Sequence, residues 1–269
     1  MKKTMKYVAS IFLMSIVLFT ACDKTDGVEN TENTQSVDFR TTQLTQIEAD
    51  MSAAYAEMGS EQIMQCIYDC LNSMPVEELS ENEIEALTFV REEELLAHDV
   101  YQALYALFPV PVFNHISNSE SLHAYAMKVL LDKYNLPDPA ENHVAGTFTN
   151  QVIQQLYNDL VAFGSENIGN ALIVGATIED VDIDDLIYHL ENDIDNQDLT
   201  YAIEQLYKGS RNHLRAFNAH LVFRNITYTP QYISQELFDN ITGSPWEFGS
   251  GFCVCNCNVS VNTIERISR

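Results

Sequence analysis

Hydrophobic residues recur every three or four positions along most of the chain, which is the spacing of amphipathic helices. A shorter helix is expected over residues 150–163, and a weaker pattern over 42–72 indicates one or two packing helices. Because only 10 glycines and 7 prolines occur, a turn-rich β-sandwich is disfavoured, and the fold class predicted is all-α. The strongest patterns predict long helices over residues 80–108, 112–134, 166–190 and 198–223.

Local signals mark several helix ends. Ser80 and Glu83 form a capping box, in which each side chain can bond a free backbone N–H group at the start of the first long helix. The segment Pro109–Pro111 ends that helix, because proline cannot continue the backbone hydrogen-bond pattern. Proline and glycine residues from position 230 onward predict an irregular C-terminal tail over 231–269.

Polar residues interrupt the hydrophobic stripe of each long helix near its middle. In the first helix Glu93 and Glu94 lie on neighbouring stripes, and the pattern does not separate them. In the second helix Glu120 and His123 are three positions apart, so both side chains point to the same side. The candidate metal ligands are therefore Glu93, Glu94, Glu120, His123, Glu179, Asp182 and His213.

A cation shared between the four helices would explain these inward-facing groups. A bare buried carboxylate costs several kcal/mol unless it is paired or bound to a metal. Carboxylate oxygens and imidazole nitrogens together suit iron, manganese or zinc. Two metal ions bridged by glutamates fit a constellation of this kind.

Plainer interpretations stay open for several of these residues. A buried histidine can simply be a hydrogen-bonded core residue, and the run Asp182–Asp185 can be a solvated acidic face. Ordinary packing is expected for Tyr101, Tyr125 and Tyr207, with a hydrogen-bonding or redox role near the centre as the alternative. The remaining histidines are not expected to be ligands, and Arg211 and Arg215 are expected to pair with acidic groups.

Four blocks of sequence carry a family resemblance: Arg91–Tyr101, Pro111–Ile116, Gly175–Leu186 and Gly209–Phe217. Together they resemble an uncharacterised family of ferritin-like domains, domain of unknown function 2202, over about residues 79–230. The resemblance implies an up-down, ferritin-like four-helix bundle with extra N-terminal helices. It also implies that two metal ions, iron or alternatively manganese or zinc, lie in the interior of the bundle. It says much less about the reaction, because the family is itself of unknown function.

One position departs from the ligand pattern of ferritin-like di-iron bundles. In those bundles two helices supply one glutamate each, and the other two supply Glu-x-x-His. Glu120 and His123 match that motif, but Ser210 stands three positions before His213, where a glutamate is expected. Asp182, one turn after Glu179, could supply the missing carboxylate.

The resemblance implies iron redox chemistry in which O₂ or H₂O₂ oxidises ferrous ions, either for iron handling or for peroxide removal. The protein would then be a di-iron oxidoreductase. The sequence identifies no catalytic group other than the ligands. A homodimer is a possible assembly. One alternative is a metal-free helical scaffold or partner-binding lipoprotein of the cell envelope. Another is a protein that stores or delivers metal without turnover.

The N-terminus has the features of an export signal. Lys2, Lys3 and Lys6 precede an apolar stretch over residues 7–19 that is too short to span a bilayer comfortably. It resembles a bacterial lipoprotein signal cleaved before Cys22, which would then be acylated, although Phe19 replaces the usual aliphatic residue. We expect a lipid-anchored envelope protein, on the periplasmic face or the cell surface. Plain secretion and an uncleaved anchor are the alternatives.

These features divide the chain into five segments. They are the signal peptide (1–21), a flexible acidic tether (22–41), an N-terminal helical extension (42–78), the bundle (79–230) and a cysteine-containing tail (231–269). The formal net charge is −25, from 39 acidic and 14 basic residues. Such a balance disfavours nucleic-acid binding, which needs lysine and arginine to neutralise phosphates, and it leaves no basic patch for anionic lipids.

The remaining cysteines form two groups. Cys66 and Cys70 are one helical turn apart, and Cys253, Cys255 and Cys257 would share one face of an extended chain. Outside the cytoplasm, disulfides among them are the expected state. A thiolate metal site and packing without pairing are the alternatives.

Overall fold

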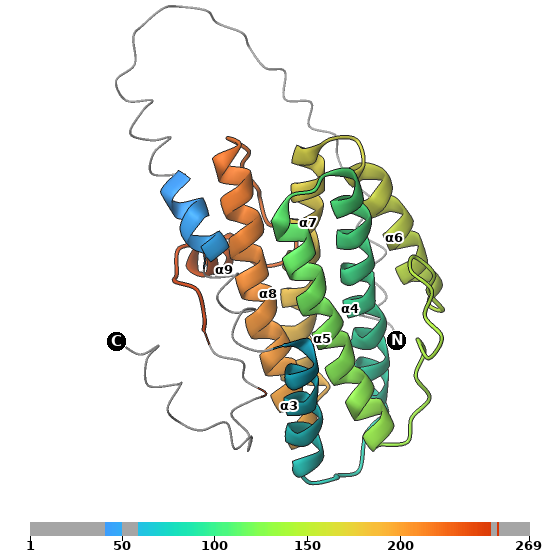
Figure 1. The fold of residues 1–269 in the computed structure, drawn as a ribbon. Helices are drawn as coiled ribbons and strands as arrows, with labels where there is room; N and C mark the ends of the chain where they lie inside the picture. Colours follow the sequence, from blue (N-terminus) through green and yellow to red (C-terminus); the bar gives the residue numbers. More distant parts are fainter. Residues whose placement is uncertain (1–40, 50–58, 249–251, 253–269) are drawn as a thin grey trace, which may run out of the picture.

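The computed structural model describes residues 41–49, 59–248 and 252, and every regular element in those ranges is helical. This agrees with the predicted all-α class. None of the described helices is long and apolar enough to cross a membrane. The named helices are α3 (Ser60–Ser73), α4 (Glu81–Leu107), α5 (Pro111–Lys133), α6 (Gln151–Gly164), α7 (Ile168–Asn192), α8 (Gln197–Phe223) and α9 (Gln235–Thr242) (Figure 1).

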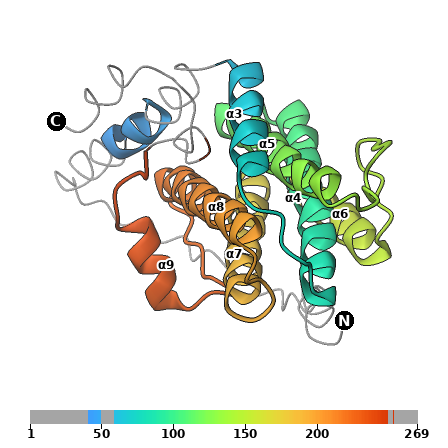
Figure 2. The ribbon, with the colours of Figure 1, turned by 90° about the horizontal axis from the view of Figure 1, so that it is seen from below.

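Four long helices form the centre of the molecule. Helix α4 packs along α5, and α7 packs along α8, with further contacts between α5 and α8 and between α4 and α7. Short connections join the members of each pair, so each pair is an antiparallel hairpin (Figure 1). Viewed along the helix axes, the four surround a common interior (Figure 2).

The other named helices cover the outside of this group. Helix α3 packs on α5, and α6 packs across α4 and α7. Helix α9 packs on α8 (Figure 2). The group of four long helices therefore has a second layer of protein over several of its sides.

The predicted helix starts follow the local chemistry. Ser80 and Glu83 make both bonds of the capping box at the start of α4. Helix α5 begins with Pro111, whose missing N–H group costs nothing at the first helical position. The predicted ends of the long helices differ from the observed ends by two residues at most.

The prediction of an irregular C-terminal tail is wrong for residues 235–242, which form α9. The side chain of Ser234 caps this helix, and Phe238 and Ile241 are buried against the core. Arg215 of α8 fixes the end of α9 by donating to the carbonyl oxygen of Ile241 at 2.9 Å. A helix of 8 residues is too short to give a clear periodic pattern between proline and glycine residues.

Polar residues divide the hydrophobic core into two clusters. On α4 the polar residue Glu94 lies between Val90, which belongs to one cluster, and Ala97, which belongs to the other. On α8 the same change occurs between Leu206 and Leu214. The corresponding pairs are Ile116 and Met127 on α5, and Ile178 and Leu186 on α7. The polar groups of all four helices therefore lie at one level of the interior.

Several predictions fall outside the described residues. These are the signal peptide and its lipidation site Cys22, and nearly all of the tether. They also include the three cysteines Cys253, Cys255 and Cys257. Of the described cysteines, Cys70 is disulfide-bonded and Cys66 is buried.

Candidate metal centre

Five buried side chains from four helices meet at this polar level and form two groups that could hold metal ions. In each group the potential ligand atoms all lie within 4.8 Å of one another. These five residues are between 1% and 8% exposed. The His123 group consists of Glu94, Glu120 and His123, and the His213 group consists of Glu120, Glu179 and His213.

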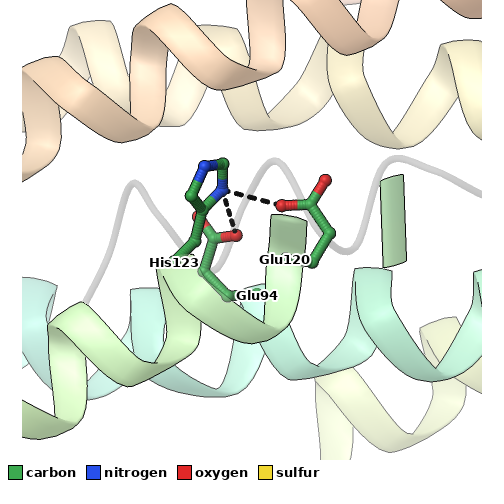
Figure 3. Close-up of side chains that lie close together, drawn as sticks. All are labelled: Glu94, Glu120 and His123. Atoms are coloured by element: carbon green, nitrogen blue, oxygen red, sulfur yellow. Dashed lines mark hydrogen bonds and ion pairs between the residues drawn. The ribbon is translucent and has the colours of Figure 1, made fainter. Parts of the chain in front are cut away.

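In the His123 group, one imidazole nitrogen faces two carboxylates (Figure 3). Nδ1 of His123 lies 2.7 Å from Oε2 of Glu120 and 3.2 Å from Oε2 of Glu94. Glu120 and His123 come from adjacent turns of α5, and Glu94 reaches them from α4. The Glu-x-x-His spacing thus gives the one-sided arrangement expected from helix geometry.

In the His213 group, an imidazole from the opposite side of the interior faces the same glutamate. Nδ1 of His213 lies 2.8 Å from Oε1 of Glu120 and 3.4 Å from Oε2 of Glu179. The rings of His123 and His213 stack with their centroids 5.5 Å apart. Glu120 therefore lies between the two histidines and presents a different oxygen to each.

The donor set and its spacing fit metal ions. Two ligand atoms bound to one ion at about 2.1 Å lie roughly 3 to 3.5 Å apart, which is close to the separations in both groups. Nδ1 of His213 and Oε1 of Glu94 are buried and make no hydrogen bond with the described residues. Nδ1 of His213 is close to Glu120 without the alignment of a hydrogen bond, which suits two atoms directed at a third.

A glycine makes room for one of the histidines. A Cβ atom at Gly209 would lie 2.5 Å from Cε1 and 2.6 Å from Nε2 of His123. Any other residue at position 209 would therefore displace the imidazole ring. This glycine on α8 allows His123 on α5 to lie flat against the opposing helix.

Buried acids elsewhere in the protein have a different environment. Asp180 accepts hydrogen bonds from the backbone N–H groups of Gln231 and Ile233 and from the hydroxyl of Tyr228. Backbone N–H groups likewise donate to the buried acids Glu83, Glu92 and Asp99. Among the described residues, no backbone N–H group donates to Glu94, Glu120 or Glu179. The buried acids therefore fall into two kinds. The loop-fixing acids accept hydrogen bonds from backbone N–H groups, and the acids of the two candidate metal groups do not.

Charge interactions within the centre shift the pKa values of its histidines. Burial lowers the pKa of His213, but Glu120 and Glu179 outweigh it and raise that pKa to about 10. Burial likewise opposes protonation of His123, and Glu94 and Glu120 raise its pKa well above the usual value. Without a metal ion, both imidazoles therefore hold protons that bound ions would displace.

The pKa values of the carboxyl groups move in two directions. Burial raises the pKa of Glu94 to about 8, even though His123 opposes the rise. Burial, with the charge of Glu120, raises the pKa of Glu179 to about 7. Burial also acts to raise the pKa of Glu120, but His213 and His123 outweigh it and hold that pKa below its usual value. Glu120 is therefore the carboxylate that stays ionised between the two histidines.

The structure separates Glu93 from Glu94. Glu94 faces His123, whereas Glu93 is buried beside Asp185 of α7 and belongs to neither group. Burial, followed by the charge of Asp185, raises the pKa of Glu93. The two stripes of α4 are neighbours, so only the packing of α5 and α7 decides which glutamate faces which partner.

The acidic run on α7 is not a solvated face at Asp182 and Asp185, since both side chains are buried. Asp182 accepts a hydrogen bond from the hydroxyl of Ser210, the residue that replaces the expected glutamate on α8. Asp182 lies near Glu94 and Glu179 and belongs to neither group. Asp185 was not among the candidates from sequence, because its neighbours made the whole run resemble a solvated face.

Tyr101 does more than pack in the core, because it also forms a hydrogen bond to one of the candidate ligands. Its hydroxyl donates to Oε1 of Glu179 and also lies 3.4 Å from the carbonyl oxygen of Gly175. Tyr101 is fully buried, and its ring packs on Phe217. The apolar stripe around it gave no sign of this hydrogen bond, which depends on how α7 packs on α4.

The other polar residues named from sequence lie away from the two groups. His98 and His143 contact Asp99, and His189 contacts Asp193. Arg211 and Arg215 both pair with Glu247, as expected of arginines near acidic groups. These contacts fix loops and the C-terminal segment rather than the centre.

Comparison with known proteins places the chain in a family. Residues 83–245 match the family described as "Uncharacterized protein domain (DUF2202)". The chain belongs to this family. The match confirms the resemblance to domain of unknown function 2202, and it contains all seven candidate ligands. It also continues past residue 230 and includes α9, so α9 is part of the family's domain.

An archaeal relative matches about two thirds of the chain. The chain is 46% identical over 179 residues to uncharacterized protein MJ0754 of Methanocaldococcus jannaschii, spanning 66% of this chain and 96% of that protein. The crystal structure of hypothetical protein MJ0754 from Methanococcus jannaschii matches with a TM-score of 0.63 at 46% identity. The match covers 65% of this chain and 99% of the crystallised one.

Proposed function

We propose that this DUF2202 protein is a ferritin-like four-helix bundle with a two-iron centre that oxidises ferrous ions with O₂ or H₂O₂. The observation that carries the proposal is the position of Glu120. Its two oxygens face the imidazoles of His123 and His213 separately, at 2.7 Å and 2.8 Å. A carboxylate placed in this way suits a bridge between two ions.

The arrangement of ligands supports a ferritin-like bundle. Each of α4, α5, α7 and α8 contributes a side chain at one level of the interior. Helix α5 carries the Glu-x-x-His motif, and α4 and α7 supply the glutamates Glu94 and Glu179. Helix α8 supplies His213 with Ser210 in place of a glutamate, and Ser210 instead orients Asp182. The protein thus keeps four carboxylates around the centre by moving one to α7.

Each residue has a defined task in this proposal. Glu94 and His123 hold one ion, Glu179 and His213 hold the other, and Glu120 bridges them. Two ferrous ions held there would supply the two electrons that, with two protons, reduce H₂O₂ to two waters. Tyr101 orients Glu179 through its hydroxyl group. The hydrophobic clusters on both sides of the polar level exclude water and strengthen these charge interactions.

We further propose that the protein is exported and anchored by a lipid on Cys22. The support is the N-terminal sequence together with the disulfide-bonded state of Cys70, since disulfides persist in oxidising compartments. Mass spectrometry of the membrane-extracted protein tests this point. We expect an N-terminal diacylated or triacylated cysteine at position 22, and an intact N-terminus at Met1 would contradict it.

Ferrous oxidation by the purified protein tests the proposed activity. Protein loaded anaerobically with two equivalents of Fe²⁺ is mixed with O₂ or H₂O₂, and formation of ferric iron is followed by absorbance. We expect oxidation much faster than in solution and repeated on further additions of Fe²⁺, and we expect Glu120→Ala to abolish it. A single round of oxidation would favour storage. A Glu120→Ala and His123→Ala double variant that is as stable as the parent, with no metal in either, would favour the metal-free scaffold.

A further inference from the structure

A small cavity lies beside the proposed centre, between α4, α6 and α7. Its lining includes five acidic residues, the proposed ligands Glu94, Glu120 and Glu179 and their neighbours Glu93 and Asp182. The lining also includes Leu156 and Leu160 on α6, a helix that contributes no ligand. The cavity therefore connects the centre with the one helix that lies across α4 and α7.

The rest of the lining is almost entirely apolar. It is formed by Leu96 and Ala97 of α4 and by Ile178 and Val181 of α7, together with Thr177. A charged or strongly hydrated molecule would lose its water contacts on entering such a space. Apolar O₂ would lose little, and H₂O₂ could regain hydrogen bonds at the acidic residues of the lining.

The cavity is also narrow. It leaves ≈ 20 Å³ of space for the centre of a water molecule. One water needs roughly 10 to 15 Å³ by this measure, so the space holds a molecule of about one or two heavy atoms. An organic substrate does not fit unless side chains move.

Leu156 and Leu160 are the most exposed of the apolar residues that line the cavity. They are 8% and 7% exposed, whereas Ile153 on the same helix is 2% exposed and does not line the cavity. Apart from Thr177, which is 9% exposed, the uncharged part of the lining comes closest to solvent at these two leucines.

We propose that this cavity is the binding site of the oxidant and that Leu156 and Leu160 restrict the oxidant to a small uncharged molecule such as O₂ or H₂O₂. This inference rests on the proposed function and adds the size and class of the second substrate. With a bulky hydroperoxide ROOH the balanced reaction would be the same two-electron cleavage. Two ferrous ions and two protons would give ROH, water and two ferric ions. The bulky hydroperoxide would react more slowly only because the two leucines keep it out of the cavity.

Selectivity between peroxides tests the proposal. Ferrous protein is mixed with H₂O₂ or with cumene hydroperoxide, and the oxidation rates are compared for the parent and for Leu156→Ala and Leu160→Ala made separately. The parent should use cumene hydroperoxide about 100-fold more slowly than H₂O₂. Each truncation should raise the cumene hydroperoxide rate at least about tenfold while changing the H₂O₂ rate by less than about threefold.

A binding measurement gives a readout that does not depend on turnover. Nitric oxide and nitrosobenzene both bind ferrous iron, and anaerobic titrations follow each by its absorption spectrum. The parent should bind nitric oxide but not nitrosobenzene, and the leucine variants should bind both. Ile153→Ala removes a similar buried side chain from α6 outside the cavity, so it should keep the selectivity of the parent.

Metal analysis of every sample separates the two ideas. Parent protein without bound iron would overturn the proposed function. Iron-loaded leucine variants that keep the parent's selectivity in both assays would overturn the oxidant route alone. If a truncated variant does not fold, Leu160→Phe, which fills the cavity, provides the second test. It should slow H₂O₂ use and nitric oxide binding at least about tenfold at unchanged iron content, and unchanged rates would overturn the route.

Discussion

Oε1 of Glu120 on α5 lies 2.8 Å from Nδ1 of His213 on α8, close enough for a hydrogen bond but without the alignment of one. The other oxygen of the same carboxylate approaches His123 at 2.7 Å. A buried carboxylate usually recruits backbone N–H donors, as Asp180 does in this protein. Glu120 is instead approached by two imidazoles, one at each oxygen of its carboxylate. This environment differs from that of the loop-fixing acids and suits the proposed sharing of Glu120 between two metal ions.

Substitutions of the ligands should remove the ions in a defined order. Glu120 belongs to both groups, so Glu120→Ala should lose both ions. His123→Ala and His213→Ala should each retain about one ion, because each histidine belongs to a single group. Metal content after gel filtration, measured by plasma mass spectrometry, checks this order. Full occupancy in Glu120→Ala would show that the carboxylate does not bridge.

Gly209→Ala should affect only the His123 side. The new Cβ atom would come within 2.6 Å of two ring atoms of His123, so the imidazole must move away from Glu94 and Glu120. We expect loss of one ion, with the His213 side still occupied. An exposed helical glycine usually gains about 1 kcal/mol on replacement by alanine, so an unfolding temperature above that of the parent would argue against the clash.

Tyr101→Phe should affect the opposite side. The change removes the hydroxyl that donates to Glu179 and leaves the packing of the ring on Phe217. A group that orients a ligand in this way typically contributes 10- to 100-fold in metal affinity, so the His213 side should weaken by about that factor. Competitive titration with a metal indicator measures both sites. Equal weakening of the two sites would mean that the effect is not transmitted through Glu179.

The metal-free protein should lose stability as the pH rises. The pKa of Glu94 is raised from 4.5 to about 8, that of Glu179 from 4.5 to about 7, and that of His213 from 6.5 to about 10. Each group stabilises the fold fully below its unfolded pKa, and this contribution is lost as the pH rises through its folded pKa. The lowered pKa of Glu120 has the opposite effect, but only at acidic pH.

Thermal unfolding between pH 6 and pH 8.5 checks this prediction. The unfolding temperature of metal-free protein should fall by at least about 5 °C over this range. Metal ions replace the protons, so the stabilisation given by a fixed metal concentration should be larger at pH 8.5 than at pH 6. A metal-free protein that becomes more stable over the range would contradict the clustering of these acids.

Asp180→Asn should separate stability from metal binding. Asp180 is buried on α7 next to Glu179 in sequence, but its carboxylate bonds the segment around Ile233. Replacing it should cost about 1 to 3 kcal/mol in the free energy of unfolding. Metal content at a temperature where the variant is folded should equal that of the parent. Loss of an ion would mean that the loop-fixing acids also support the centre.

The helices and the level of the polar residues follow from the sequence, because both depend on spacing along one helix. Glu120 with His123, and Glu179 with His213, could be chosen in this way. The choice between Glu93 and Glu94 could not, since their stripes are neighbours and packing against other helices decides it. The hydrogen bond of Tyr101 was missed for the same reason.

The density of acidic residues on α7 favoured a solvated face, and this alternative interpretation is wrong for two of them. The acidic run on α7 resembled a solvated face, yet Asp182 and Asp185 are buried. Their burial is tolerable because Ser210 donates to Asp182, and Glu93 lies beside Asp185. These partners come from α8 and α4, and nothing in the spacing along α7 indicates them. The pattern along one helix therefore cannot predict the burial of an acid whose partner lies on another helix.

Anomalous X-ray diffraction from crystals of the protein prepared with Fe²⁺, at wavelengths on either side of the iron edge, tests the central claim most directly. The account predicts two peaks of iron per chain, one beside His123 and one beside His213, with the Glu120 carboxylate between them. A map with no anomalous peak among these side chains, while they keep the positions described, would contradict it.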